Sequence, residues 1–217
     1  MIENTKKRYN SLNEINFVPL SSDYIQLLEK FKTYQTELRK FLIEDALNNQ
    51  GIFISKTYLL FDKENFNQHK QDISKLMLLG YVTITADSIN LDSSLKEMFR
   101  EKGVNYKSLP AMKIGRLCVD KRFERSGLGR MLIAFCIKQA CALNNEYACR
   151  FITLDAKRHN EIEKDSLHFY TKMGFEVLLH RNKSKIDLIK QTSGLAPMYL
   201  DLYHIIKNSE QETEAKV

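Results

Sequence analysis

The run VDKRFERSGLGRML places two glycines two positions apart at the start of a long apolar segment. The first amide groups of a helix have no intrahelical acceptor, and the summed peptide dipoles leave a partial positive charge there. Gly127 and Gly129 lack Cβ atoms, so an oxyanion could reach the amides of residues 125–130. The pattern indicates a phosphate or pyrophosphate site, to which Arg125 and Arg130 could add charge-assisted hydrogen bonds, although it also occurs as a plain turn.

Two other phosphate-binding motifs do not fit this run. A P-loop requires GxxxxGK followed by Ser or Thr, and the sequence contains no such run. A dinucleotide fingerprint requires GxGxxG and an acidic residue at the end of a following strand. This run reads GLGRML, which lacks the third glycine, and no acidic residue ends a following strand at the expected distance from it. Nucleotide hydrolysis and dinucleotide binding are therefore not expected here.

The elements that must position this run read as a mixed α/β sheet. Strand-forming runs occupy residues 56–62, 75–87, 111–120, 150–156 and 197–206. Apolar residues at helical spacing occupy residues 23–32, 37–49, 94–103, 130–143 and 164–173. We expect two helices before the sheet, antiparallel pairing of the first two strands with a polar surface excursion between them, and a right-handed parallel crossover between the third and fourth.

Length and composition fit one soluble domain. The chain has 217 residues, of which 43% are hydrophobic and 28% charged, which is enough to build a core. We expect a single domain over residues 1–208 and a disordered polar tail over residues 209–217. No apolar run reaches the roughly 18 residues of a membrane span, and the first residues show no secretory pattern, so a cytoplasmic protein is expected.

Neither the net charge nor the cysteine spacing identifies the ligand. The net charge of +6 favours polyanionic partners, and a phosphate-bearing cofactor satisfies it as well as RNA does. The four cysteines show no CxxC or His-x-x-Cys spacing, so we expect neither a disulfide framework nor a metal site. The cysteines are Cys118, Cys136, Cys141 and Cys149.

The run RLCVDKRFERSGLGRMLI, followed further along by SLHFYTKMGFEVL, resembles the GNAT superfamily of N-acetyltransferases. In that superfamily a strand, a glycine loop and a helix hold the pyrophosphate of coenzyme A, and an FYxxxGF helix end lies near the thioester sulfur. The resemblance covers residues 56–177 and the final strand. It implies acetyl-CoA as the cofactor and a GNAT-like, mostly antiparallel mixed sheet with a central, splayed parallel strand pair and helices on both faces.

Within the superfamily, the layout resembles bacterial toxins that acetylate the amino group of aminoacyl-tRNA. The supporting runs are FLIEDALNNQ before SKTYLLFD, then LLGYVTITADSI and IGRLCVD. Relative to those toxins, the chain has additional segments near residues 63–74, 94–103 and 178–196. It departs from the superfamily motif at Glu124, where Gln or Arg is usual, at Arg125, where Gly is usual, and at Glu163, where Asn is frequent.

The resemblance implies a set of site residues. The amides of Leu117, Cys118 and Val119 would bind the acetyl and pantetheine groups, and Tyr170 would be the general acid for the departing thiolate. The pyrophosphate loop would comprise Arg125, Ser126, Gly127, Leu128, Gly129 and Arg130.

Each chemical role has an alternative. Tyr170 shares a helical stripe with Leu167 and Met173, as a core tyrosine would. Cys118 could be a covalent nucleophile, but a cysteine that alternates with apolar residues on a strand is more often a small core residue. The candidates for a general base, all expected to be exposed side chains by default, are Asp120, Glu124, Asp155, His159 and His168.

The expected function is acetyl transfer from acetyl-CoA to a primary amine by direct attack. The sharpest alternative is a toxin that acetylates aminoacyl-tRNA and has an antitoxin partner, and a second is a non-catalytic CoA-binding module. A small RNA-binding protein ranks last, because no RNP-type strand motif or arginine-rich block is present. A membrane partner is not expected, and a homodimer is left open.

Overall fold

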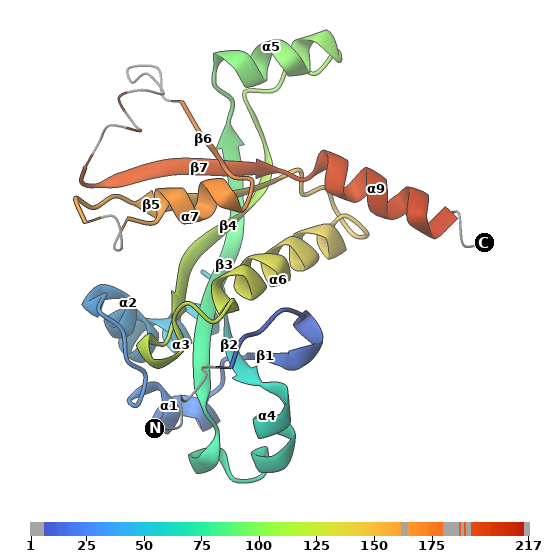
Figure 1. Ribbon diagram of the computed structural model, residues 1–217. Coiled ribbons are helices and arrows are strands. Elements are labelled where there is room, and N and C mark those ends of the chain that lie inside the picture. Colours follow the sequence, from blue (N-terminus) through green and yellow to red (C-terminus); the bar gives the residue numbers. More distant parts are fainter. Residues whose placement is uncertain (1–6, 162–164, 180–186, 188, 190–191, 215–217) are drawn as a thin grey trace. The chain divides into compact units, whose positions relative to one another are not determined.

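The computed structural model describes residues 7–161, 165–179, 187, 189 and 192–214 of the chain (Figure 1). It divides into two compact units, Met1–Thr85 with Ile114–Cys136 and Ala86–Lys113 with Ile137–Val217. Three elements contribute residues to both units: strands β3 (Leu78–Asn90) and β4 (Ser108–Val119) and helix α6 (Leu128–Leu143). Glu163 and part of the expected additional segment 178–196 lie outside the described residues.

Strands of the first unit follow the order β1-β2-β3-β4. Strand β1 (Ile15–Pro19) pairs antiparallel with β2 (Lys56–Asp62), with Ile15 opposite Asp62, and β2 pairs antiparallel with β3. The predicted antiparallel pairing of the first two strand-forming runs is confirmed. The expectation that only helices precede the sheet is wrong. Strand β1 is short, ends in a proline and lies at the edge of the sheet, where a proline is tolerated.

The N-terminal helices are more broken than the periodicity predicts. Instead of one helix over residues 23–32, a 3₁₀ turn (Ser22–Tyr24) leads into the short helix α1 (Ile25–Leu28). The second predicted helix is present. It consists of α2 (Thr36–Lys40), a π-helical segment (Phe41–Asp45) and α3 (Ala46–Gly51).

Helix α4 (Lys63–His69) occupies the segment expected to be a polar surface excursion. Asp62 caps it, because its Oδ1 accepts a hydrogen bond from the Asn65 amide at 2.9 Å. The helix also packs Phe66 against the core, where its ring lies 5.4 Å from that of Phe61.

One apolar cluster packs the helices of the first unit against its strands. Its members come from α1, the α2–α3 segment, β2, β3, β4 and the loops that flank them, and all of them are buried. They include Leu28, Phe31, Leu42, Leu59, Phe61, Tyr81 and Cys118. This core fixes the end of β4, from which the glycine loop starts.

Strands of the second unit follow the order β3-β4-β5-β7-β6. Strand β5 (Phe151–Lys157) pairs antiparallel with β7 (Leu195–Asp201), which pairs antiparallel with β6 (Glu176–Val177). The helices of this unit are α5 (Ser93–Glu101), α7 (Leu167–Lys172) and α9 (Tyr203–Glu214), joined by the end of α6. Helix α5 lies where the additional helix is predicted.

The C-terminal segment differs from the expectation. The final strand stops at Asp201 rather than continuing to Ile206, and helix α9 runs to Glu214, through most of the segment expected to be disordered. The Asp201 carboxylate accepts a hydrogen bond from the Tyr203 amide at 2.9 Å and so starts the helix. The polar residues that follow include several Glu, Gln and Lys, which extend a helix without needing a core.

Among the described residues, seven strands are hydrogen-bonded in the order β1-β2-β3-β4-β5-β7-β6. Strands β4 and β5 are neighbours joined through helix α6, the connection that a parallel pair requires. The pairs β1–β2, β2–β3, β5–β7 and β6–β7 are antiparallel. The predicted mixed, mostly antiparallel sheet is confirmed. Within the described ranges, none of the helices has the length and apolar character needed to cross a membrane.

Candidate functional site

The glycine loop of the first unit connects β4 to α6. After Val119, a 3₁₀ turn (Lys121–Phe123) leads to residues 124–127, and α6 starts at Leu128. Arg125 and Gly127 both have positive φ, 60° and 92°. The loop is therefore left-handed at Arg125, the position at which the resemblance leads us to expect glycine. Holding a side chain there costs roughly 1 to 2 kcal/mol.

Asp120 anchors the start of this loop. Its side chain is completely buried, and its carboxylate accepts hydrogen bonds from the amides of Lys32, at 2.8 Å, and Arg122, at 2.9 Å, and from the Arg122 side chain. Burial by itself would raise the pKa of Asp120, but these hydrogen bonds outweigh it and lower the pKa below its usual value. The expectation of an exposed carboxylate is wrong. Asp120 is a poor general base because its lowered pKa makes it a weak proton acceptor and both of its oxygens are already hydrogen-bonded.

Ser126 is held from two sides. Its hydroxyl donates a hydrogen bond to the Phe123 carbonyl, and its own carbonyl accepts one from the Tyr9 amide at 2.8 Å. A Cβ atom built on Gly127 would lie 2.3 Å from the Tyr9 carbonyl oxygen. On this side of the loop, the group that approaches Gly127 closely is therefore the Tyr9 carbonyl, which belongs to the N-terminal segment of the chain.

The other side of the loop suits an anion. Helix α6 has sixteen residues, and the amides of its first residues, Leu128 and Gly129, have no intrahelical acceptor. The Gly127 carbonyl accepts hydrogen bonds from the amides of Arg130, at 3.0 Å, and Met131, at 3.3 Å, which starts the helix. Arg125 and Arg130 are both exposed. Amide donors at a helix N-terminus with two adjacent guanidinium groups are a donor set for phosphate oxygens.

The end of β4 is closely packed. A Cβ atom on Gly80 of β3 would lie 2.8 Å from the Cys118 carbonyl oxygen, so only glycine fits there. Leu117 and Val119 are half-buried, whereas Cys118 is buried and its Sγ lies 3.4 Å from Thr33 Oγ1. Burial raises the pKa of the Cys118 thiol to about 11. Cys118 is thus a core residue and a poor nucleophile, in agreement with the favoured interpretation.

Tyr170 lies on α7 in the second unit. Its side chain is buried, and its ring contacts those of Phe169 and Phe175 edge to face, with centroids 5.1 and 5.8 Å apart. The Phe175 amide donates to the Tyr170 carbonyl at 3.1 Å, which closes the helix before β6. The tyrosine is thus firmly positioned by the core of its own unit.

A cavity of about 580 Å³ lies beside α7. Two of the candidate bases, His159 and His168, are among its lining residues, with Arg158, Leu167 and Thr171. Asp155 is not free, because its Oδ2 lies 2.7 Å from Lys113 Nζ.

A family model described as an acetyltransferase (GNAT) domain matches residues 94–177. We refer to residues 94–177, which are similar to this family, as the GNAT segment. A search of the curated proteins finds no match for the sequence. The GNAT segment contains β4, the glycine loop, α6, β5 and α7, and therefore all the residues predicted for the site.

Solved structures share the fold over most of the chain. A tyrosine-to-phenylalanine variant of KacT is 19% identical, with a TM-score of 0.65 and coverage of 91% of this chain and 98% of that one. AtaT complexed with acetyl-methionyl-tRNAfMet is 18% identical, with a TM-score of 0.65 and coverage of 88% and 96%. A tyrosine-to-phenylalanine variant of the AtaT toxin, bound to the C-terminus of the antitoxin AtaR and acetyl-CoA, is 17% identical, with a TM-score of 0.61 and coverage of 88% and 96%. At these identities the likeness establishes the fold alone.

The structure assigns the predicted residues of the GNAT segment to different units. Leu117 to Val119 and the glycine loop belong to the first unit, whereas Asp155, His159, His168 and Tyr170 belong to the second. Their roles in cofactor binding and catalysis stay predictions.

Sequence reasoning missed Tyr9 and Asp62, which lie before the GNAT segment. The available signal was the run SLNE, in which Ser11 and Glu14 form a reciprocal capping box. It indicates that the chain is already ordered there.

Proposed function

We propose that the protein is an acetyl-CoA-dependent N-acetyltransferase whose glycine loop, residues 124–130, binds the cofactor pyrophosphate. The observation that carries this proposal is the loop itself. It lies in the GNAT segment, has left-handed backbone at Arg125 and Gly127, and ends at the N-terminus of a sixteen-residue helix. The resemblance leads us to expect a glycine at position 125, yet the arginine there keeps the required backbone conformation. The chemistry of the donor set fits a pyrophosphate.

Each group of the chain has a proposed task. The amides of Leu128 and Gly129 bind pyrophosphate oxygens, and the guanidinium groups of Arg125 and Arg130 add charge. Bound acetyl-CoA supplies an acetyl thioester that an amine can attack. Amides at the end of β4, residues 117–119, hold the acetyl carbonyl, and Tyr170 Oη donates the proton that the leaving sulfur needs.

The acceptor that fits best is an α-amino group. Asp120 is bound to Arg122, and Asp155 to Lys113, so these two carboxylates are poorly placed to take a proton from an acceptor. An ordinary α-amino group has a pKa near 8 and is partly neutral at physiological pH, whereas a lysine amine has a pKa of about 10.4 and needs a base. This reasoning favours the α-amino group of aminoacyl-tRNA, which would place the reaction in the cytoplasm.

One comparison and the net charge support the tRNA acceptor. AtaT, which shares the fold, was solved with acetyl-methionyl-tRNAfMet, and the net charge of +6 suits a polyanionic acceptor. A protein antitoxin would then be the natural partner, since AtaT also was solved with part of its antitoxin AtaR. A homodimer stays a separate prediction, to be checked by analytical ultracentrifugation.

The decisive experiment measures acetyl transfer from radiolabelled acetyl-CoA to a mixed pool of aminoacyl-tRNA, with lysine-containing peptides as the competing acceptor class. We expect labelled tRNA with the wild type. Tyr170→Phe should lose turnover and keep its affinity for coenzyme A, because the hydroxyl is needed only for proton transfer. Binding of coenzyme A by the wild type without turnover on any amine would instead identify a non-catalytic CoA-binding module. Label on the peptides alone would refute the tRNA acceptor.

A further inference from the structure

The N-terminal strap, defined here as residues 7–11, lies against the glycine loop within the first unit. Its central residue, Tyr9, donates its backbone amide to the Ser126 carbonyl at 2.8 Å. The Tyr9 carbonyl lies so close to Gly127 that no side chain fits between them. The strap thus contacts the loop through backbone atoms at two successive residues, Ser126 and Gly127.

This contact fixes the orientation of one peptide group. The Ser126–Gly127 peptide is trans, so its C=O and N–H point in opposite directions. Because Tyr9 binds the C=O, the N–H of Gly127 points away from the strap. A flip of this peptide would turn the carbonyl oxygen, rather than the amide hydrogen, toward the side that faces away from the strap. The carbonyl would repel a phosphate, whereas the amide binds one.

A buried carboxylate holds the strap in place. Asp62 is nearly buried, and its Oδ2 accepts hydrogen bonds from Lys7 Nζ at 2.7 Å and Tyr9 Oη at 3.1 Å, while its Oδ1 caps helix α4 through Asn65. The Tyr9 side chain is itself buried. Beyond the strap, Glu14 Oε1 accepts the amides of Asn10 and Ser11, at 2.9 and 2.7 Å. The strap is therefore fastened on both sides of its contact with the loop.

We propose that the N-terminal strap is a positioning element for cofactor binding: Tyr9 sets the Ser126–Gly127 peptide so that the Gly127 amide is available to the pyrophosphate, and Asp62 holds Tyr9. This inference rests on the proposed function of the glycine loop. It assigns a role to residues that lie ahead of the GNAT segment. Tyr9 and Asp62 act through the loop and are positioning residues.

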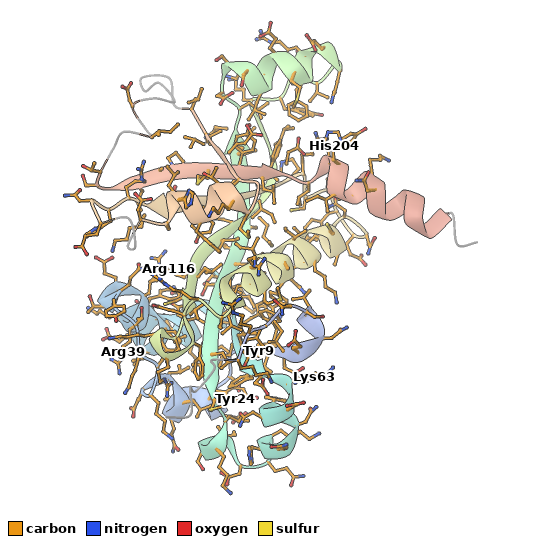
Figure 2. The ribbon with its side chains drawn as sticks, in the orientation of Figure 1. Tyr9, Tyr24, Arg39, Lys63, Arg116 and His204 are labelled. Carbon is orange, nitrogen blue, oxygen red and sulfur yellow. The ribbon has the colours of Figure 1, made fainter. Side chains whose placement is uncertain are left out.

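The sharpest test removes the backbone N–H of Tyr9, which donates the hydrogen bond to Ser126. Replacing Tyr9 by the α-hydroxy acid analogue of tyrosine turns its amide into an ester, which deletes the N–H and keeps the side chain. The same replacement at Tyr24, which Figure 2 labels together with Tyr9, is the matched control. The Tyr24 amide donates to the Ser21 carbonyl at 3.2 Å. Affinity for free coenzyme A is measured by calorimetry, and folding stability by urea unfolding.

We expect the ester at Tyr9 to weaken coenzyme A binding by roughly tenfold and the ester at Tyr24 to leave it unchanged, while both lower stability to a similar extent. Equal affinities for wild type and the Tyr9 ester would overturn the proposal, as would equal losses for both esters, since a loosened fold would explain them. A wild type that binds no coenzyme A would overturn the function of the loop and this inference together.

Side-chain variants give a second, independent reading. Tyr9→Phe keeps the ring and loses the hydroxyl on Asp62, and Asp62→Asn keeps a cap on α4 while losing the charge that holds Lys7. Both should weaken coenzyme A binding by roughly threefold and should speed hydrogen exchange in residues 123–129, measured by mass spectrometry without ligand. Unchanged exchange in that loop would show that the strap does not hold it and would refute the proposal.

Discussion

Arg122 binds both carboxylate oxygens of Asp120, with Nε 2.8 Å from Oδ1 and Nη2 2.9 Å from Oδ2. The arginine side chain is partly exposed, whereas the aspartate is completely buried. The pair, together with the Lys32 and Arg122 amides, fixes the point where β4 turns into the glycine loop.

Loss of this carboxylate should be costly. Asp120→Ala would leave the Lys32 and Arg122 amides without their acceptor and would remove the buried carboxylate that binds the Arg122 side chain, and we expect the free energy of unfolding to fall by about 2–4 kcal/mol. Urea denaturation at pH 7 measures this change. Asp72→Ala removes an exposed carboxylate paired with Lys75 and is the control, with little change expected. A similarly small decrease in the free energy of unfolding for both variants would show that the buried Asp120 stabilises the fold no more than an exposed carboxylate does.

The same carboxylate predicts a pH dependence. The pKa of Asp120 is lower in the folded chain than its unfolded value of about 3.9, so the stability it contributes is present above that value and is lost as the pH falls through the folded pKa. Asp62, whose pKa is lowered too, behaves in the same way. Unfolding free energies between pH 7 and 3 should therefore decline in the wild type and decline less steeply in Asp120→Asn. Parallel curves for the two proteins would contradict this assignment.

Gly127 and Gly51 should respond to alanine in opposite directions. At Gly127 the added Cβ would meet the Tyr9 carbonyl and force a left-handed alanine, so Gly127→Ala should lower the free energy of unfolding by about 2–4 kcal/mol. At Gly51, the last residue of α3, nothing lies within 4 Å of the new atom. Gly51→Ala should therefore raise stability by up to about 1 kcal/mol. Thermal unfolding of the two variants checks the pair, and a tolerated alanine at position 127 would mean that the strap moves readily.

The four cysteines should differ in reactivity. Burial raises the pKa to about 11 for Cys118 and Cys149 and to about 12 for Cys136, so almost no thiolate is present at pH 8. Cys141 is only half-buried. We expect iodoacetamide to label Cys141 first in the folded protein and the other three only after unfolding, as followed by peptide mass spectrometry. Early labelling of Cys118 would show that its thiol is accessible and reactive, as a nucleophile requires.

The sequence predicted best what depends on local patterns. Helix α6 and its two flanking strands follow from a long apolar run between strand-forming runs, and the glycine pair marks the loop. Strand β1 was missed because five residues ending in a proline carry little periodicity, and its pairing with β2 is a distant contact. Helix α9 was missed because a polar composition does not distinguish a disordered tail from an exposed helix.

The residues expected in the site stay predictions, and the contacts that hold them in place were not predicted. Asp120 reads as an exposed acid in the sequence, and only the fold shows that Lys32 and Arg122 surround it. Tyr9 carries no motif, and its contact with Ser126 joins residues far apart in the chain. Such long-range backbone contacts leave no signature in a single sequence.

The contact between Tyr9 and Ser126 shows that the segment matched by the family model is smaller than the part of the chain that shapes its glycine loop. The GNAT segment begins at residue 94, so the donor that orients its glycine loop is encoded outside it. A fragment expressed from residue 12 onward would contain every recognisable motif and still lack that donor. A comparison of relatives that aligns only the shared segment would attribute differences in cofactor affinity to the loop. The actual cause of such a difference could be a substitution near the first residues of the chain.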